Sequence, residues 1–244
     1  MTLVGCQSFS EKDRAAADLH LQIGATHFEK GNFPYALKEL LLAESLDPKN
    51  PLVQNNLGLV YFVREKYPES AKHFQRAVEI RSDFSEARNN LGRTYIELKD
   101  YSAAEKQLLI VLGDLTYPGT DRAQTNFGIL KFHQKKYAEA KSSLNEAIKM
   151  NKENCLAHNF LGRTLFEEAN YSAASEALDR AIRFCQKNLF DEPHYYSALS
   201  WYRGGDKSRA LTRLKEVVAL YPDGKYRDKA RSMIEIIEKG GISE

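Results

Sequence analysis

The hydrophobic positions of this 244-residue chain recur at three- and four-residue spacing along most of its length. One segment shows the pattern clearly, with apolar side chains at Leu57, Tyr61, Phe74, Ala77 and Val78. Such spacing gathers the apolar residues on one face of a helix. Only 7 prolines and 14 glycines interrupt the chain, too few for the frequent turns of an all-β protein. The pattern therefore predicts an all-α protein.

The same pattern returns with a period close to 34 residues. Each copy but the last contains one glycine at an equivalent position, which we call its marker glycine. At fixed intervals after this glycine come a small residue, a large apolar residue and another small or slim residue, as at Ala36, Leu40 and Ala43 in the first copy. A sixth copy is degenerate, with Ala198 at the glycine position. The marker glycines of the other copies are Gly24, Gly58, Gly92, Gly128 and Gly162. One helix pair of this kind cannot bury its own apolar face, so neighbouring pairs must stack.

These recurring positions resemble the tetratricopeptide repeat, a helix–turn–helix unit of 34 residues. The resemblance implies an α-solenoid superhelix of six repeats with a capping helix at its C-terminal end. Residues 1–16 are then an N-terminal segment and linker, and residues 225–244 hold the capping helix and a tail. We place the repeats at 17–50, 51–84, 85–118, 121–154, 155–188 and 191–224.

Charge and motifs narrow the function further. The chain has 35 basic and 33 acidic residues and a formal net charge of +2, which disfavours a nucleic-acid-binding face. It contains no HExxH, GxGxxG, GxxxxGK[ST] or GxSxG motif and no CxxC pair. We therefore expect no catalytic residues, no metal site and no cofactor, and a protein that is not an enzyme. An enzyme-associated peptide-recognition module would need a catalytic domain, for which residues 17–239 leave no room.

The first residues carry a separate signal. Leu3-Val4-Gly5-Cys6 resembles a bacterial lipobox, whose cysteine is acylated after cleavage. The basic and apolar regions of a signal peptide do not precede it here, so a chance match stays open. The resemblance implies a lipid on Cys6. The residue after the cysteine is Gln7 and not aspartate, and in this respect the chain resembles lipoproteins that are sorted to the outer membrane. Several acyl chains would anchor the protein firmly.

A lipobox followed by six such repeats resembles the type IV pilus biogenesis and stability lipoproteins, the pilotins of the pilus secretin. The similar segments are Gln22–Ala25, Asn89–Gly92, Thr116–Pro118 and Gln134–Lys141. This resemblance implies a protein-interaction scaffold at the periplasmic face of the outer membrane. Its partner would be a secretin subunit or a peptide segment of one. The alternative is a cytoplasmic adaptor or co-chaperone that binds a peptide in its concave groove.

The first helix of each repeat should line that concave groove with its second, fifth, ninth and twelfth residues. Apolar side chains that the fold does not need often mark a partner site. Asparagine amides can pair with a peptide backbone, and arginines with carboxylates. The alternative is that neighbouring helices or a terminal segment fill the groove. The candidate residues are Phe28, Leu52, Asn55, Leu59, Phe62, Asn89, Arg93, Ile96, Ile129, Phe132, Asn159, Arg163 and Phe166.

Two cysteines fall at the two ends of one predicted helix pair. Cys155 opens the fifth repeat and Cys185 closes it, so an antiparallel hairpin makes them neighbours. A disulfide between them would require an oxidising compartment. We expect buried free thiols instead.

Overall fold

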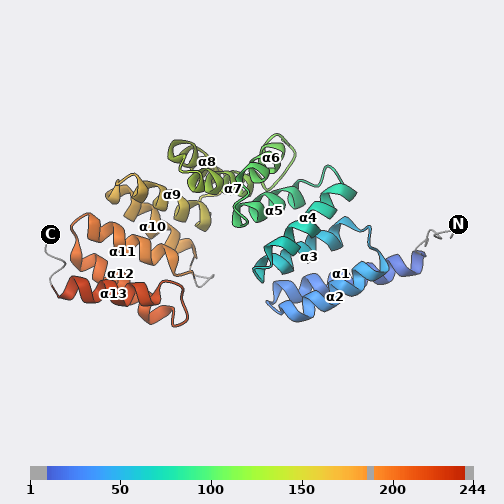
Figure 1. Cartoon of the computed structure of the whole chain (residues 1–244), viewed down its shortest axis with the longest axis horizontal. Helices are drawn as coiled ribbons and strands as arrows, with labels where there is room; N and C mark the ends of the chain where they lie inside the picture. The colour runs from blue at the N-terminus through green and yellow to red at the C-terminus, as the bar shows by residue number, and fades with distance from the viewer. Residues whose placement is uncertain (1–9, 186–189, 240–244) are drawn as a thin grey trace. The chain divides into compact units, whose positions relative to one another are not determined.

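The computed structural model describes residues 10–185 and 190–239, so the proposed lipid-bearing Cys6 lies outside the described residues. Within those ranges the chain forms thirteen α-helices and no strand (Figure 1). The predicted all-α fold of repeated helix–turn–helix pairs is confirmed. The chain divides into two compact units, Met1–Pro118 and Gly119–Glu244.

The first unit contains three helix pairs. Each first helix packs against the second helix of its own pair, and each second helix against the first helix of the next pair. The helices are α1 (Glu11–Glu29), α2 (Phe33–Leu46), α3 (Pro51–Val63), α4 (Tyr67–Ile80), α5 (Ser85–Glu97) and α6 (Tyr101–Leu112).

Helix α1 begins earlier than the repeat pattern indicated. Ser10 Oγ accepts a hydrogen bond from the Asp13 N–H at 3.1 Å, and Asp13 Oδ2 accepts one from the Ser10 N–H at 3.0 Å. This capping box satisfies two N–H groups at the helix start. Residues 11–16, which we expected to belong to a linker, are therefore helical.

The second unit contains three further pairs and a final helix. Helix α13 packs against α12, as expected for a capping helix. The exposed side chains of α13 are all polar or charged, as the end of a stacked array requires. The helices are α7 (Thr120–His133), α8 (Tyr137–Met150), α9 (Cys155–Glu167), α10 (Tyr171–Cys185), α11 (Glu192–Arg203), α12 (Lys207–Leu220) and α13 (Arg227–Glu238).

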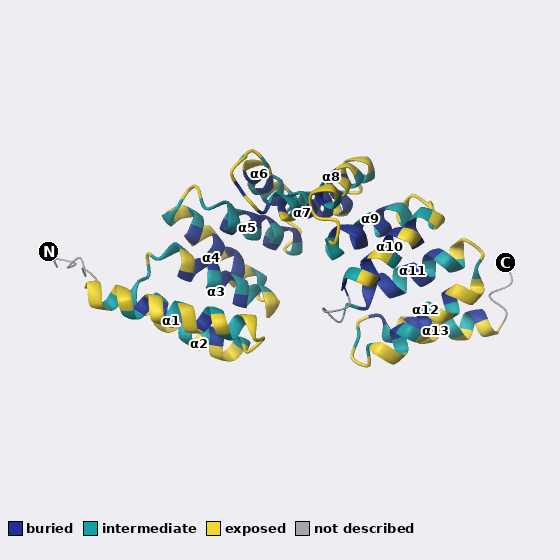
Figure 2. Ribbon diagram, turned by 180° about the vertical axis from the view of Figure 1, so that it is seen from behind, coloured by how far each residue is buried: buried dark blue, intermediate teal, exposed yellow. Residues whose placement is uncertain are grey.

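The marker glycines bring the two helices of a pair into close contact. A Cβ on Gly92 would lie 2.7 Å from Cγ of Leu108, and one on Gly128 would lie 2.6 Å from Cγ of Leu144. Both leucines are fully buried. Buried residues gather where the helices of a unit face one another, while exposed residues follow the turns and outer faces (Figure 2). The glycines therefore serve packing.

The turn inside each pair has the same backbone conformation. One residue at an equivalent place has a positive φ, between 58° and 91°. In the second pair the Glu65 N–H donates to the Phe62 carbonyl and the Lys66 N–H to the Tyr61 carbonyl, both at 2.9 Å. This arrangement ends the first helix in the manner of a Schellman motif. The left-handed residues are Gly31, Glu65, Lys99, Lys135, Ala169 and Gly205.

The expectation of free thiols in the fifth repeat is wrong. Cys155, at the start of α9, and Cys185, at the end of α10, form a disulfide with their Cα atoms 5.2 Å apart. Because α9 and α10 are antiparallel, their outer ends meet and bring the two cysteines within bonding distance. The disulfide closes the open end of this helix pair.

Candidate functional site

The predicted inner positions of the first unit come from α1, α3 and α5. Aromatic side chains at equivalent positions of α1 and α3 each contact the aromatic residue that begins the next helix. The ring centroids are 5.7 Å apart for Phe28 and Phe33, and 5.5 Å apart for Phe62 and Tyr67. Burial, with the nearby Glu97, raises the pKa of the Tyr67 hydroxyl. Phe28 and Phe62 remain half-buried, so part of each ring is accessible.

The aliphatic candidates of this unit differ in how far they are exposed. Leu52 is 43% exposed. Leu59 is half-buried and packs against the cluster that contains Phe74 and Leu91. Ile96 is only 3% exposed. The expectation that Ile96 lines an open wall is therefore wrong, because this position lies in the packed interior.

The two candidate asparagines of the first unit are buried, and one of them links adjacent repeats. Asn55 and Asn89 are 6% and 2% exposed. The Asn55 carbonyl oxygen accepts a hydrogen bond of 3.2 Å from the side chain of Asn90 in the next repeat. The sequence had suggested that these amides could pair with a peptide backbone, but neither is open to one. Arg93 forms an ion pair of 2.8 Å with Glu97 on its own helix.

In the second unit the corresponding aromatic position is closed. Phe132 is 8% exposed and Ile129 is fully buried, so neither forms an open groove wall. The guanidinium of Arg163 lies 4.6 Å from the centroid of the Phe132 ring and 5.0 Å from that of Tyr196. A cation over aromatic faces is attracted by their electron-rich surface.

Three contacts to the carboxylate of Glu192 complete the closure. Arg163 forms an ion pair of 3.1 Å with Glu192, which also accepts a hydrogen bond of 2.8 Å from Asn159. The Tyr226 hydroxyl, from the segment before α13, donates to the same carboxylate at 2.8 Å. Burial and Glu192 together raise the pKa of Tyr226 well above its ordinary value. Around Phe132 the protein's own side chains therefore occupy the inner face, as the alternative allowed.

The remaining candidate of the second unit, Phe166, is half-buried. Its ring contacts Tyr171 at 5.5 Å and Tyr196 at 5.8 Å. The contribution of Tyr226 was missed at the level of sequence, because it lies outside the repeats. Its signal in the sequence is an aromatic residue directly before the final helix.

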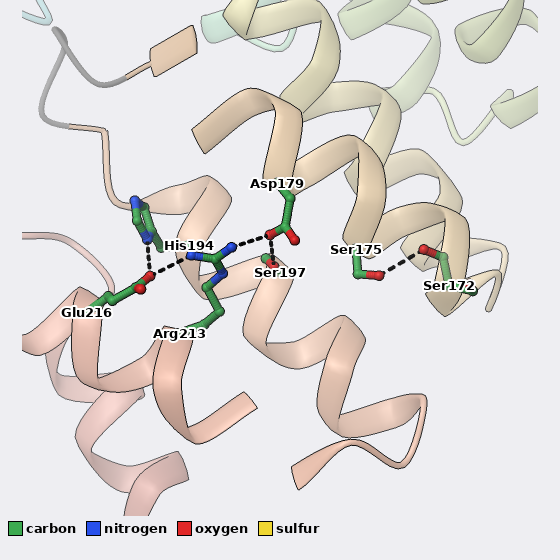
Figure 3. A network of polar contacts seen from close by, with 7 residues as sticks. All are labelled: Ser172, Ser175, Asp179, His194, Ser197, Arg213 and Glu216. Atoms are coloured by element: carbon green, nitrogen blue, oxygen red, sulfur yellow. Dashed lines mark hydrogen bonds and ion pairs between the residues drawn. The ribbon is translucent and has the colours of Figure 1, made fainter. Parts of the chain in front are cut away.

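A second polar network joins α10, α11 and α12 (Figure 3). Arg213 contacts Asp179 at 3.0 Å and Glu216 at 2.8 Å. Glu216 also pairs with His194 at 3.1 Å, and Ser197 donates to Asp179 at 2.8 Å. Burial lowers the pKa of His194 despite the neighbouring Glu216. The network ties the last two repeats together.

The described residues contain no group of three or more histidine, cysteine, aspartate or glutamate side chains placed to hold a metal ion. In the same residues, no helix combines the length and the apolar character needed to cross a bilayer.

Family models of the tetratricopeptide repeat match four stretches of the chain, residues 24–63, 51–109, 131–202 and 194–224. The matches cover helices of both units. They agree with the helix pairs and marker glycines described above.

One curated relative and two of the similar solved structures are pilus proteins. The type IV pilus assembly protein PilF of Pseudomonas aeruginosa is 27% identical over 164 residues, which span 67% of this chain and 65% of PilF. A solved structure of Pseudomonas aeruginosa PilF has a TM-score of 0.71 at 21% identity, covering 91% of this chain and all of that one. The structure of PilW, a type IV pilus biogenesis factor, has a TM-score of 0.76 at 18% identity, covering 88% and 98%.

At these identities the structural matches establish the fold, and the helix pairs, glycine contacts and turns establish the repeat. The chain is thus a tetratricopeptide repeat protein, an interaction scaffold similar in sequence to the type IV pilus assembly protein PilF and in fold to PilF and PilW.

Proposed function

We propose that this chain is a non-enzymatic scaffold, anchored through a lipid on Cys6 to the periplasmic face of the outer membrane, that helps subunits of a type IV pilus secretin to assemble. The relation to a pilus assembly protein supports the process. The lipobox-like Leu3–Cys6 supports the anchor. The Cys155–Cys185 disulfide supports an oxidising compartment, because cytoplasmic thiols are kept reduced.

The partner binds the inner positions of the first unit. The observation that carries this step is the contrast between two equivalent aromatic residues. Phe62 in the first unit is half-buried, whereas Phe132 in the second is 8% exposed and lies beneath Arg163. An accessible aromatic ring is a good anchor because it removes a large apolar area from water on binding.

Three side chains surround this anchor by position. Leu52 and Leu59 lie on the same helix as Phe62 and offer further apolar surface, and Phe28 repeats the aromatic position one repeat earlier. Arg93, half-buried on α5, already pairs with Glu97 at 2.8 Å, so it is not part of this apolar surface. The proposed binding surface therefore contains only some of the thirteen candidate residues. In the second unit the inner positions around Phe132 are already occupied by the protein's own side chains.

The binding step is tested by co-purification of the secretin subunit with the full-length lipidated protein from detergent-solubilised outer membranes. Phe62→Glu should lower the recovered secretin ten-fold or more, because a buried anchor commonly carries at least about 2 kcal/mol. Tyr35→Glu is the matched control: Tyr35 is an aromatic residue of the same unit, 63% exposed on α2. It should leave recovery unchanged.

Thermal melts separate loss of binding from loss of fold. Phe62→Glu should melt close to the unsubstituted protein, whereas Ala77→Phe, at a fully buried helix contact, should melt earlier because overpacking costs about 1–3 kcal/mol. If Phe62→Glu melts as early as Ala77→Phe, the ring belongs to the core. Unchanged secretin recovery with a normal melt would refute the proposed surface.

The anchor has its own test. Cells that express the gene with its native upstream region should incorporate labelled palmitate into the protein, and Cys6→Ser should abolish the label. If the label is absent, or survives the substitution, the lipoprotein assignment fails and the cytoplasmic adaptor becomes the better explanation.

A further inference from the structure

A stripe along α1 faces away from both α2 and the inner surface. Its residues follow one another at four- and three-residue spacing, which places them on one helix face. They are Lys12, Ala16, Leu19, Ile23, Thr26 and Lys30. Leu19 is 56% exposed and Ile23 is 36% exposed. Figure 2 shows most of α1 as exposed or intermediate, and its buried residues are Ala17 and Gly24.

The same positions are interior in the next repeat. One repeat length after Leu19, Ile23 and Thr26 stand Val53, Leu57 and Val60, and all three are 0% exposed. They form one core cluster with Ala36, Leu40 and Ala43 of α2. In α3 the equivalent stripe is therefore covered by α2, the second helix of the preceding repeat. In α1 the two central residues are still large and apolar, but no preceding repeat covers them among the described residues.

Terminal repeats usually present a polar outer face, because an exposed apolar face favours association. Helix α13 follows this rule at the other end of the chain, where its exposed side chains are polar or charged. Helix α1 departs from it. A hollow of about 310 Å³ also lies on this face, lined by Leu19, Gln22, Ile23, Thr26, His27 and Lys30. The shape and the residue types together are those of an uncovered packing surface.

The charges on the stripe indicate what covers it. Lys12 and Lys30 are both exposed and stand at its two ends, with no charged residue between them on this face. A second copy of α1, packed antiparallel with Leu19 against Ile23, would bring Lys12 close to Lys30 of that copy. Like charges at such a contact are unfavourable. The polar outer face of α13 is also a poor match for Leu19 and Ile23.

We propose that this α1 face docks an amphipathic helix of a partner protein, which extends the stack as α2 does on α3. The partner helix carries a stripe of two small residues around a leucine, like Ala36, Leu40 and Ala43 in α2, with an acidic residue at each end to meet Lys12 and Lys30. This inference does not depend on the lipid, on the secretin or on the inner surface of the first unit.

The test uses the full chain and two labelled synthetic helical peptides. Both peptides carry the stripe of alanine, leucine and alanine at the spacing found in α2. One has glutamates at its two ends and the other has lysines. The glutamate peptide should bind at least ten-fold more tightly than the lysine peptide. Lys30→Glu in the protein should narrow or reverse that preference, and this exchange of exposed charges leaves the packing untouched.

Leu19→Gln and Ile23→Gln should each weaken binding of the glutamate peptide by about ten-fold, because each removes an apolar contact at the centre of the stripe. Leu115→Gln is the matched control: Leu115 is 96% exposed in the same unit, away from this stripe. It should leave binding unchanged. Equal binding of the two peptides, or wild-type binding by both α1 variants, overturns the proposal.

Two other occupants give distinct results. A concentration-dependent dimer in sedimentation, dissociated by Leu19→Gln, would assign the face to a second copy. Tighter peptide binding after deletion of residues 1–9 would assign it to the chain's own N-terminal segment. Either result overturns the partner helix. Loss of secretin recovery in Phe62→Glu has no bearing on these measurements, so the two proposals fail separately.

Discussion

A Cβ atom on Gly58 would lie 2.6 Å from Cε1 of Phe74, closer than non-bonded carbons come in proteins. Gly58 sits in the middle of α3 and the Phe74 ring, on α4, is fully buried. The absence of a side chain on Gly58 therefore leaves the space that the Phe74 ring occupies. In the other four repeats that have this glycine, a leucine on the second helix takes the place of the phenylalanine, as Leu40 does opposite Gly24. These repeats therefore pair a glycine on the first helix with a large side chain on the second.

Gly58→Ala should destabilise the protein although alanine is the better helix former. The helix gains about 1 kcal/mol from the substitution, but the displaced ring costs about 1–3 kcal/mol and disturbs the neighbouring repeats. Denaturant unfolding measures the difference. In a Phe74→Ala background the clash is gone, so Gly58→Ala should there become neutral or stabilising. Equal destabilisation in both backgrounds would contradict the proposed relationship.

Ala169→Gly should stabilise the protein. Ala169 has a φ of 59°, in the left-handed region, which costs an ordinary residue about 1–2 kcal/mol. Glycine removes that cost and loses about 0.5–1 kcal/mol through the flexibility of the unfolded chain, so a small gain remains. A higher melting temperature is the expected result. Gly205→Ala, at the equivalent place with a φ of 91°, is the matched control and should lower it.

These two predictions mark how far sequence reasoning reaches. The Gly58–Phe74 relationship was visible in the sequence, because close packing of two helices restricts residue size at fixed intervals. The left-handed turn was not, because only Gly31 and Gly205 carry its usual residue. In the other four repeats the helix contacts on either side impose the conformation, and the local sequence gives no sign of it.

The candidate site was harder to predict for a similar reason. Helical spacing correctly placed Phe62 and Phe132 at equivalent positions, but spacing says nothing about what covers them. Phe132 is closed by Arg163 from the next repeat, and Arg163 is held by Glu192 and, through it, Tyr226. Those contacts depend on the path of the chain after α12, which no repeat position encodes.

Breaking the Cys155–Cys185 disulfide should lower stability. The bond closes a loop with a sequence separation of 30 residues, for which restriction of the unfolded chain contributes about 2–4 kcal/mol. Replacing both cysteines by serine should therefore lower the melting temperature. Reducing agent should have a similar effect on the unsubstituted protein and none on the double variant. A melting temperature that does not respond to either treatment would contradict the prediction.

Phe132→Glu should destabilise the protein, unlike Phe62→Glu. The ring is 8% exposed and contacts Phe160 and Arg163. A carboxylate there loses the aromatic contacts and must be buried, which costs several kcal/mol unless Arg163 turns to pair with it. Phe132→Leu keeps the site apolar and serves as the control, with a smaller loss. If Phe132→Glu unfolds at the same denaturant concentration as the unsubstituted protein, the ring does not belong to the core.

Stability should fall as the pH is lowered below the ordinary histidine pKa of about 6.5. Burial lowers the pKa of His194 and of His73 in the folded protein. The unfolded chain therefore binds protons first as the pH falls, and protonation favours unfolding. The stability contributed by the neutral imidazoles is present above about pH 6.5 and is lost as the pH falls through the lowered pKa values.

The contribution of His194 can be isolated. Its ring contacts Glu216, and Arg213 and Asp179 lie in the same network, so the substitution must keep a hydrogen bond. His194→Gln does this and cannot titrate. The free energy of unfolding, measured at about pH 7.5 and about pH 5, should fall less in this variant than in the unsubstituted protein, because one proton-binding group of the unfolded state is gone. His20→Gln is the control, because His20 also pairs with a carboxylate, Glu39 at 2.7 Å, but is more exposed. An equal pH dependence in His194→Gln and the unsubstituted protein would show that His194 is not a source of acid sensitivity.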